Sequence, residues 1–127
     1  MRSPKQTLTE QELEIMKVVW QLETATVRQV YETMLERRRI AYTTVMTMMN
    51  ILEQKGHLKK CQDDRAYVYR SSRPQKQVIR SMVREFVNRV FNGSAEPLLV
   101  HLVEDQHLDA KDLEEIRKTI RKGSNKS

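Results

Sequence analysis

A ten-residue stretch, "AYTTVMTMMN" (residues 41–50), carries side chains that could contact DNA bases. In the major groove, Asn can pair with adenine, and Thr and Met can contact thymine methyl groups. The side chains in question are uncharged, most of them are short, and they are spaced along one side of a helix: Tyr42, Thr43, Thr44, Met46, Thr47 and Asn50. The pattern also fits an ordinary amphipathic helix whose methionines are core residues and whose threonines have no special role.

Basic side chains flank this stretch on both sides. Arg28 falls in the first turn of the preceding helix, which crosses the DNA backbone in helix-turn-helix docking. Lys59, Lys60 and Arg65 follow in a predicted hairpin. We expect these four residues to contact phosphates, while the helix between them contacts bases.

Catalytic and metal sites lack the residues they need. His57, His101 and His107 form no pair at helical i,i+4 spacing, and no Cys-x-x-Cys or Cys-His set accompanies them. Cys61 is the only cysteine, which excludes an internal disulfide and suits a reducing cytoplasm. The sequence therefore predicts a cytoplasmic protein that is not an enzyme, with no metal and no cofactor. No apolar run reaches the roughly 18 residues of a membrane span, so we expect no membrane association.

Composition and charge point in the same direction. The chain has 127 residues, of which 39% are hydrophobic and 31% charged, and its formal net charge is +6. The basic surplus lies in residues 24–72. A polyanionic partner would explain that surplus, although a solvated basic face is the simpler alternative.

Local signals predict the elements that would position the helix of residues 41–50. Thr9 with Glu12, and Thr26 with Gln29, have capping-box spacing and open two amphipathic helices. The third helix runs to about Lys55, with an apolar side made of Val45, Met48, Met49 and Leu52. Two short strands, 58–61 and 66–70, form a hairpin with no further strand to pair with. Three helices followed by a hairpin is the order of a winged helix-turn-helix.

Beyond the boundary at residues 71–74, three more helices are predicted at about 75–91, 96–104 and from Asp109 onward. Their apolar residues could pack within the chain or hold a homodimer, and the width of the stripe favours the homodimer. The residues expected at that interface are Val78, Ile79, Met82, Val83, Phe86, Val90, Leu99, Leu102, Ile116 and Ile120. The predicted fold is mostly α, with a winged helix-turn-helix DNA-binding domain at 1–72 and a three-helix dimerisation domain at 73–127.

Four segments together resemble the BlaI/MecI penicillinase-repressor family: "LTEQELEIMKVVW", "TVRQVYETM", "AYTTVMTMMNILEQKG" and "DDRAYVYRSS". The resemblance extends from about residue 8 to residue 122. It implies a winged-helix repressor that dimerises through its C-terminal helices and binds a palindromic operator with TACA/TGTA-type half-sites. It also implies that residues 42–44, 46 and 47 lie where the family's recognition helix meets the operator.

The resemblance further implies relief of repression by proteolysis. In staphylococcal members, a β-lactam-triggered membrane sensor protease leads to a cut at an Asn-Phe bond in the dimerisation domain. The corresponding segment here, "LLVHLVED", offers His101-Leu102 instead. Those members also have Arg at the position of Met46, which would alter base readout. The C-terminal cysteine cluster of copper-responsive relatives is absent.

The sequence thus predicts a homodimeric transcriptional repressor, with operator DNA, a second copy of the chain and a sensor-linked protease as partners. The alternative is a winged-helix adaptor that binds proteins and has lost specific DNA binding.

Overall fold

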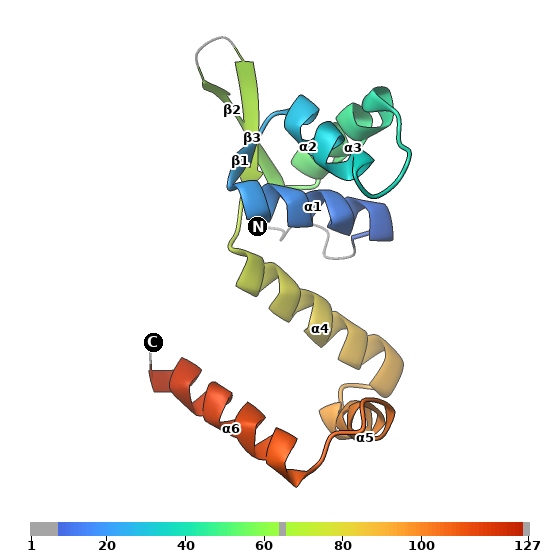
Figure 1. Cartoon of the computed structure of the whole chain (residues 1–127), viewed down its shortest axis with the longest axis vertical. Coiled ribbons are helices and arrows are strands. Elements are labelled where there is room, and N and C mark those ends of the chain that lie inside the picture. The colour runs from blue at the N-terminus through green and yellow to red at the C-terminus, as the bar shows by residue number, and fades with distance from the viewer. Residues whose placement is uncertain (1–7, 64–65, 126–127) are drawn as a thin grey trace. The chain divides into compact units, whose positions relative to one another are not determined.

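A computed structural model describes residues 8–63 and 66–125. These residues form six helices and three strands, in the order α1 (Glu10–Leu22), β1 (Thr24–Ala25), α2 (Val27–Leu35), α3 (Tyr42–Gln54), β2 (Leu58–Asp63), β3 (Ala66–Ser71), α4 (Gln75–Phe91), α5 (Ala95–Asp105) and α6 (Ala110–Asn125) (Figure 1). The chain divides into two compact units between Val83 and Arg84, within α4. The predicted domain boundary at 72/73 stays a prediction.

Both predicted capping boxes are present and start the first two helices. The Thr9 hydroxyl accepts from the Glu12 backbone N–H at 3.1 Å, and the Glu12 carboxylate accepts from the Thr9 N–H at 2.9 Å. Thr26 and Gln29 make the same reciprocal pair at α2, at 3.1 and 2.8 Å. Each box satisfies backbone donors that the first helical turn leaves without partners.

The N-terminal unit is a helix-turn-helix with a wing. Helices α1, α2 and α3 pack against one another, and Figure 1 shows them to one side of the sheet. The fully buried residues of the core come from all three helices and include Ile15, Val30 and Met49. Gly56, with φ of 89°, follows the end of α3 and turns the chain toward β2.

The sheet differs from the predicted two-stranded hairpin, because residues 24 and 25 add a third strand. The strand order is β1-β3-β2, so β3 is central and is paired on both sides. Ala25 lies opposite Tyr69 across β1 and β3, and Lys60 lies opposite Tyr69 across β2 and β3. The hairpin prediction was wrong on this point, since a two-residue strand has no periodicity that a sequence could display.

Trp20 connects α1 to the end of the sheet. Its indole N–H donates to the Ser71 hydroxyl at 3.0 Å, and that hydroxyl donates to the backbone carbonyl of Arg73. The chain then enters α4, whose first turns still belong to the N-terminal unit. Val78 is buried in the N-terminal core, and Met82 packs against that core.

The C-terminal unit comprises residues 84–125 as far as they are described, and its helices leave most apolar side chains exposed. Leu99, Leu102, Ile116 and Ile120 are all exposed, and Ile120 most of all. The Phe86 and Phe91 rings contact edge-on, with centroids 5.9 Å apart. Asp109 and Asp112 form a reciprocal capping pair at the start of α6.

Glu12 also holds the end of α3. The Lys55 ammonium donates to both carboxylate oxygens of Glu12, at 2.9 and 3.0 Å. Burial raises the pKa of Glu12, but the hydrogen bonds from Thr9 and the Lys55 ammonium outweigh burial, and the pKa is lowered overall. The ionised carboxylate is therefore the form that stabilises the fold.

This pairing predicts a pH-dependent stability difference. Because the folded-state pKa lies below the unfolded value of about 4.3, the stabilisation is present above that value and lost as the pH falls through the folded pKa. Glu12→Gln keeps a capping side chain but loses the charge. It should lower the free energy of unfolding by about 2 kcal/mol near pH 7, with the difference from wild type shrinking below about pH 4.

Urea denaturation at several pH values measures this effect. Glu14→Gln is the matched control, because the Glu14–Arg38 pair is longer, at 3.9 Å, and more exposed; it should cost less than about 1 kcal/mol. A Glu12→Gln penalty that stays constant down to pH 3 would contradict the role assigned to the carboxylate.

Candidate nucleic-acid interface

Helix α3 has one buried side and one exposed, uncharged side. Val45, Met49 and Leu52 are fully buried, and Met48 is half-buried. The exposed side carries the predicted base-contacting residues, Tyr42, Thr43, Thr44, Met46, Thr47 and Asn50. The core of the unit therefore determines which side of α3 faces solvent, and that side is free of charged groups from residue 42 to residue 50.

The N-terminus of α3 is shaped by an aromatic contact. Ala41, at the N-cap, provides no capping side chain. The Tyr42 ring meets the Tyr31 ring of α2 edge-on, with centroids 5.4 Å apart. This contact positions Tyr42 between the two helices of the helix-turn-helix, beside the exposed side of α3.

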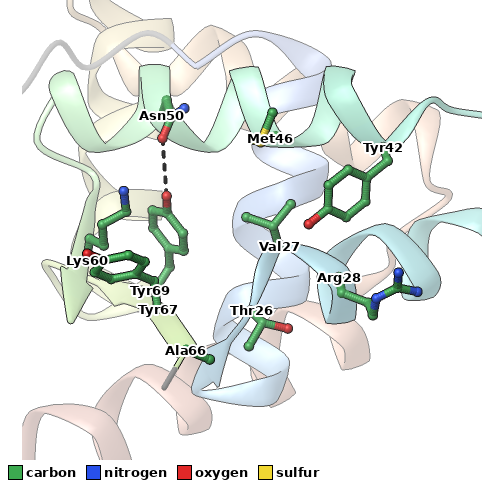
Figure 2. A pocket seen from close by; sticks show the side chains of 10 residues that line it. All are labelled: Thr26, Val27, Arg28, Tyr42, Met46, Asn50, Lys60, Ala66, Tyr67 and Tyr69. Atoms are coloured by element: carbon green, nitrogen blue, oxygen red, sulfur yellow. Dashed lines mark hydrogen bonds between the residues drawn. The ribbon is translucent and has the colours of Figure 1, made fainter. Parts of the chain in front are cut away.

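A groove lies between α3, the start of α2 and the wing strands (Figure 2). Its volume is about 340 Å³. The residues that line it are Thr26, Val27, Arg28, Tyr42, Met46, Asn50, Lys60, Ala66, Tyr67 and Tyr69. Five of these are predicted DNA-contacting residues: Arg28, Tyr42, Met46, Asn50 and Lys60. The fold thus brings together side chains from three elements that are separated in sequence.

The wing side of the groove is formed by two tyrosines and a lysine. The Lys60 ammonium lies 4.8 Å from the centroid of the Tyr67 ring and 5.7 Å from that of Tyr69, distances suited to cation–π contacts. The Tyr69 hydroxyl donates to the Asn50 side-chain oxygen at 3.2 Å, drawn as the dashed line in Figure 2. Lys60 is therefore held over the tyrosines of β3, and it lines the groove beside α3.

Lys59 and Lys60 lie on opposite faces of β2. Successive strand residues alternate between faces, and the register pairs Lys59 with Arg70 but Lys60 with Tyr69. Of the two lysines, Lys60 lines the groove beside α3. Arg65, the third basic residue predicted in the wing, lies outside the described residues.

Arg28 is exposed at the edge of the groove. Its guanidinium approaches the Glu32 carboxylate at 3.4 Å, one turn along α2, and both side chains are more than half exposed. Such surface pairs contribute little to stability. Arg28 can therefore exchange this partner for another anion at small cost.

Sequence reasoning missed Tyr67 and Tyr69 as groove residues. Alternation along β3 places both on one face. However, only the register with β2 and the packing of β3 on the helices reveal that this face borders α3. The register is a property of the folded sheet, so the sequence contained no direct signal for it.

The residues of the predicted cleavage bond lie within α5. His101 and Leu102 are both exposed, and the His101 ring lies 5.9 Å from the Phe91 ring. Within residues 8–63 and 66–125, no group of three His, Cys, Asp or Glu side chains is arranged to bind a metal ion. In the same ranges, no helix has the length and apolar character needed to cross a membrane.

The helix-turn-helix, the wing and the groove between them define a winged helix-turn-helix protein. Residues 8–122 match the family model of the penicillinase repressors. The chain belongs to the penicillinase-repressor family, as the four sequence segments predicted.

Named relatives agree with this assignment. The chain is 36% identical over 100 residues to the transcriptional regulator BlaI of Mycobacterium tuberculosis, covering 77% of this chain and 72% of that protein. It is 24% identical over 119 residues to the penicillinase repressor of Bacillus licheniformis, covering 94% of this chain and 93% of the relative. The methicillin resistance regulatory protein MecI of Mammaliicoccus sciuri is 24% identical over 111 residues, covering 87% of this chain and 90% of the relative.

The fold is similar to that of a solved structure. This is the solution structure of the monomeric form of Bacillus licheniformis BlaI in complex with the blaP half-operator. The TM-score is 0.52 at 25% sequence identity, and the match covers 60% of this chain and 92% of that chain. The mostly α, winged-helix fold class predicted from the sequence is confirmed.

Proposed function

We propose that this protein is a homodimeric transcriptional repressor that inserts α3 into the major groove of a palindromic operator. The observation that carries the proposal is the exposed, uncharged side of α3 beside a groove whose edges hold Arg28 and Lys60. Membership of the penicillinase-repressor family and the DNA-bound relative of similar fold support it.

The exposed side of α3 is suited to reading bases. Thr43, Thr44, Met46, Thr47 and Asn50 are short enough to let the helix approach base edges closely, and they supply hydrogen-bonding groups and apolar contacts. The cations predicted from the sequence, Arg28, Lys59, Lys60 and Arg65, would contact phosphates and set the orientation of the helix. Among these four residues, Lys60 is the one whose phosphate contact is best supported, because its ammonium is held over the Tyr67 ring at the groove.

We expect Thr47→Ala to weaken binding to the operator by about tenfold, because a base contact is lost. Binding to random DNA should change by less than twofold, since that binding depends on phosphates. Thr44→Ala should behave in the same way. Competition gel shifts with operator and random duplexes measure both affinities. Equal losses on the two duplexes would rule out base reading by Thr47.

The two wing lysines provide a matched pair of variants. Lys60→Ala should weaken binding to operator and random DNA alike and reduce the slope of log K against log salt by about 0.9. Lys59→Ala removes the same charge from the opposite face of β2 and should have the smaller effect. Titrations of each variant at several salt concentrations test this. If neither the wild type nor the variants bound DNA, the protein-binding adaptor would become the better explanation.

The exposed apolar residues of the C-terminal helices support a homodimer. The members of the predicted set that are exposed are Ile79, Val83, Phe86, Val90, Leu99, Leu102, Ile116 and Ile120. A monomer rarely leaves so many large apolar side chains in water without a partner. Val78 is not available for this interface, and Met82 only in part, because they pack in the N-terminal core.

Repression would be relieved by cleavage at His101-Leu102, through a protease linked to a sensor. The bond lies within the helix α5. A protease would therefore act on α5 in a locally opened state, and the opening equilibrium would limit the rate of cleavage.

Cleavage should convert the dimer to monomers and release operator DNA. A variant with a specific protease recognition sequence inserted between His101 and Leu102 tests this. Sedimentation should report the loss of dimer after the cut, and a gel shift the loss of operator binding. The same recognition sequence placed ahead of Met1 is the control and should leave both unchanged. A cleaved protein that stays bound to the operator as tightly as before would contradict the mechanism.

A further inference from the structure

Among the described residues on the exposed side of α3, Asn50 is the one whose side chain hydrogen-bonds to the wing. The bond runs from the Tyr69 hydroxyl to the Asn50 Oδ1 at 3.2 Å. Tyr69 is only 2% exposed and lies in the central strand, paired with Ala25 on one side and Lys60 on the other. Its hydroxyl is therefore a fixed point, and it restricts how the Asn50 amide can turn.

The hydrogen bond sets which end of the amide faces Tyr69. A phenol donates hydrogen bonds more readily than it accepts them, so the amide oxygen turns toward Tyr69 and the amino group turns away. Figure 2 shows this arrangement, with the Asn50 oxygen toward the Tyr69 hydroxyl and the nitrogen away from it. The end of the amide that is turned away from Tyr69 is therefore the amino group, which carries two hydrogen-bond donors, while the oxygen keeps one further lone pair.

This orientation changes the base that Asn50 should prefer. An Asn that reads adenine uses both ends of its amide, accepting from N6 and donating to N7. Tyr69 takes one of the two lone pairs of the oxygen and holds the amide in this orientation, so the amino group is better placed than the oxygen to reach a base. Guanine presents two acceptors, N7 and O6, at its major-groove edge.

We propose that Asn50, oriented by Tyr69, selects guanine over adenine at the base pair it contacts. Tyr69 is a positioning residue for this selection and does not itself touch the base. The proposal rests on the proposed function, because it assigns a specificity to the helix proposed to read the operator.

The test is a selection of binding sites from duplexes with randomised positions, followed by affinity measurements. The position read by Asn50 is the one whose preference disappears in Asn50→Ala. Wild type should prefer guanine to adenine there by about tenfold. Tyr69→Phe frees the amide, so the preference should fall to within about twofold or shift to adenine. Preferences at the other positions should not change.

Tyr67→Phe is the matched control. It removes the hydroxyl of the neighbouring ring beneath Lys60 but leaves the Asn50–Tyr69 hydrogen bond in place, so the guanine preference should persist. Thermal melting of each variant confirms that it is folded. Because Asn50→Ala alone identifies the position, a wild-type preference for adenine there overturns the proposal even if Tyr69→Phe does not fold.

The possible outcomes distinguish this proposal from the proposed function on which it rests. Wild-type selection of adenine at the Asn50 position, or a guanine preference that Tyr69→Phe leaves intact, would overturn the role of Tyr69 while the protein remained a specific DNA binder. That role is equally overturned if other positions are selected but none responds to Asn50→Ala. A wild type with no sequence preference at any position would overturn both proposals.

Discussion

The hydrogen bonds of the Glu12 carboxylate connect the two helices on which the DNA-facing geometry depends. One carboxylate oxygen closes the capping box at the start of α1, and both oxygens accept from Lys55 at the end of α3. The ammonium also lies at the C-terminal end of α3, where the helix dipole favours a positive charge. A single buried anion thus fixes the start of one helix and the end of another, and so constrains the rotation of α3 in the core.

That constraint explains why the exposed side of α3 can be short and uncharged. Its other side is held by buried contacts of Val45, Met49 and Leu52, so the helix needs no surface ion pairs to fix its position. Long charged side chains would keep α3 away from a base-pair edge, whereas Thr and Asn allow close approach. The cations are instead carried by neighbouring elements, Arg28 on α2 and Lys60 on β2. In the proposed complex with DNA, phosphate contacts and base contacts would therefore be made by different elements.

The features predicted correctly from the sequence are those with local causes. The capping boxes at Thr9 and Thr26, and the buried and exposed sides of α3, follow from residues within one or two turns of each other. The third strand could not be predicted, because residues 24 and 25 become a strand only by pairing with β3. For the same reason, Tyr69 could not be predicted as a groove residue. Its place beside Asn50 depends on tertiary packing between segments 19 residues apart.

The wide apolar stripe of α4 has two parts with different surroundings, and the sequence alone does not distinguish them. Val78 and Met82 pack in the N-terminal core, whereas Phe86 and Val90 lie beyond the division between the units and are exposed. The first part of the stripe therefore needs no partner subunit to explain it. Only the exposed side chains indicate a dimer, and they are fewer than the sequence suggested. The exposed set still favours a dimer, since these side chains keep 40–64% of their surface exposed in the described part of the chain, and exposing apolar surface to water costs about 25 cal/mol per Å².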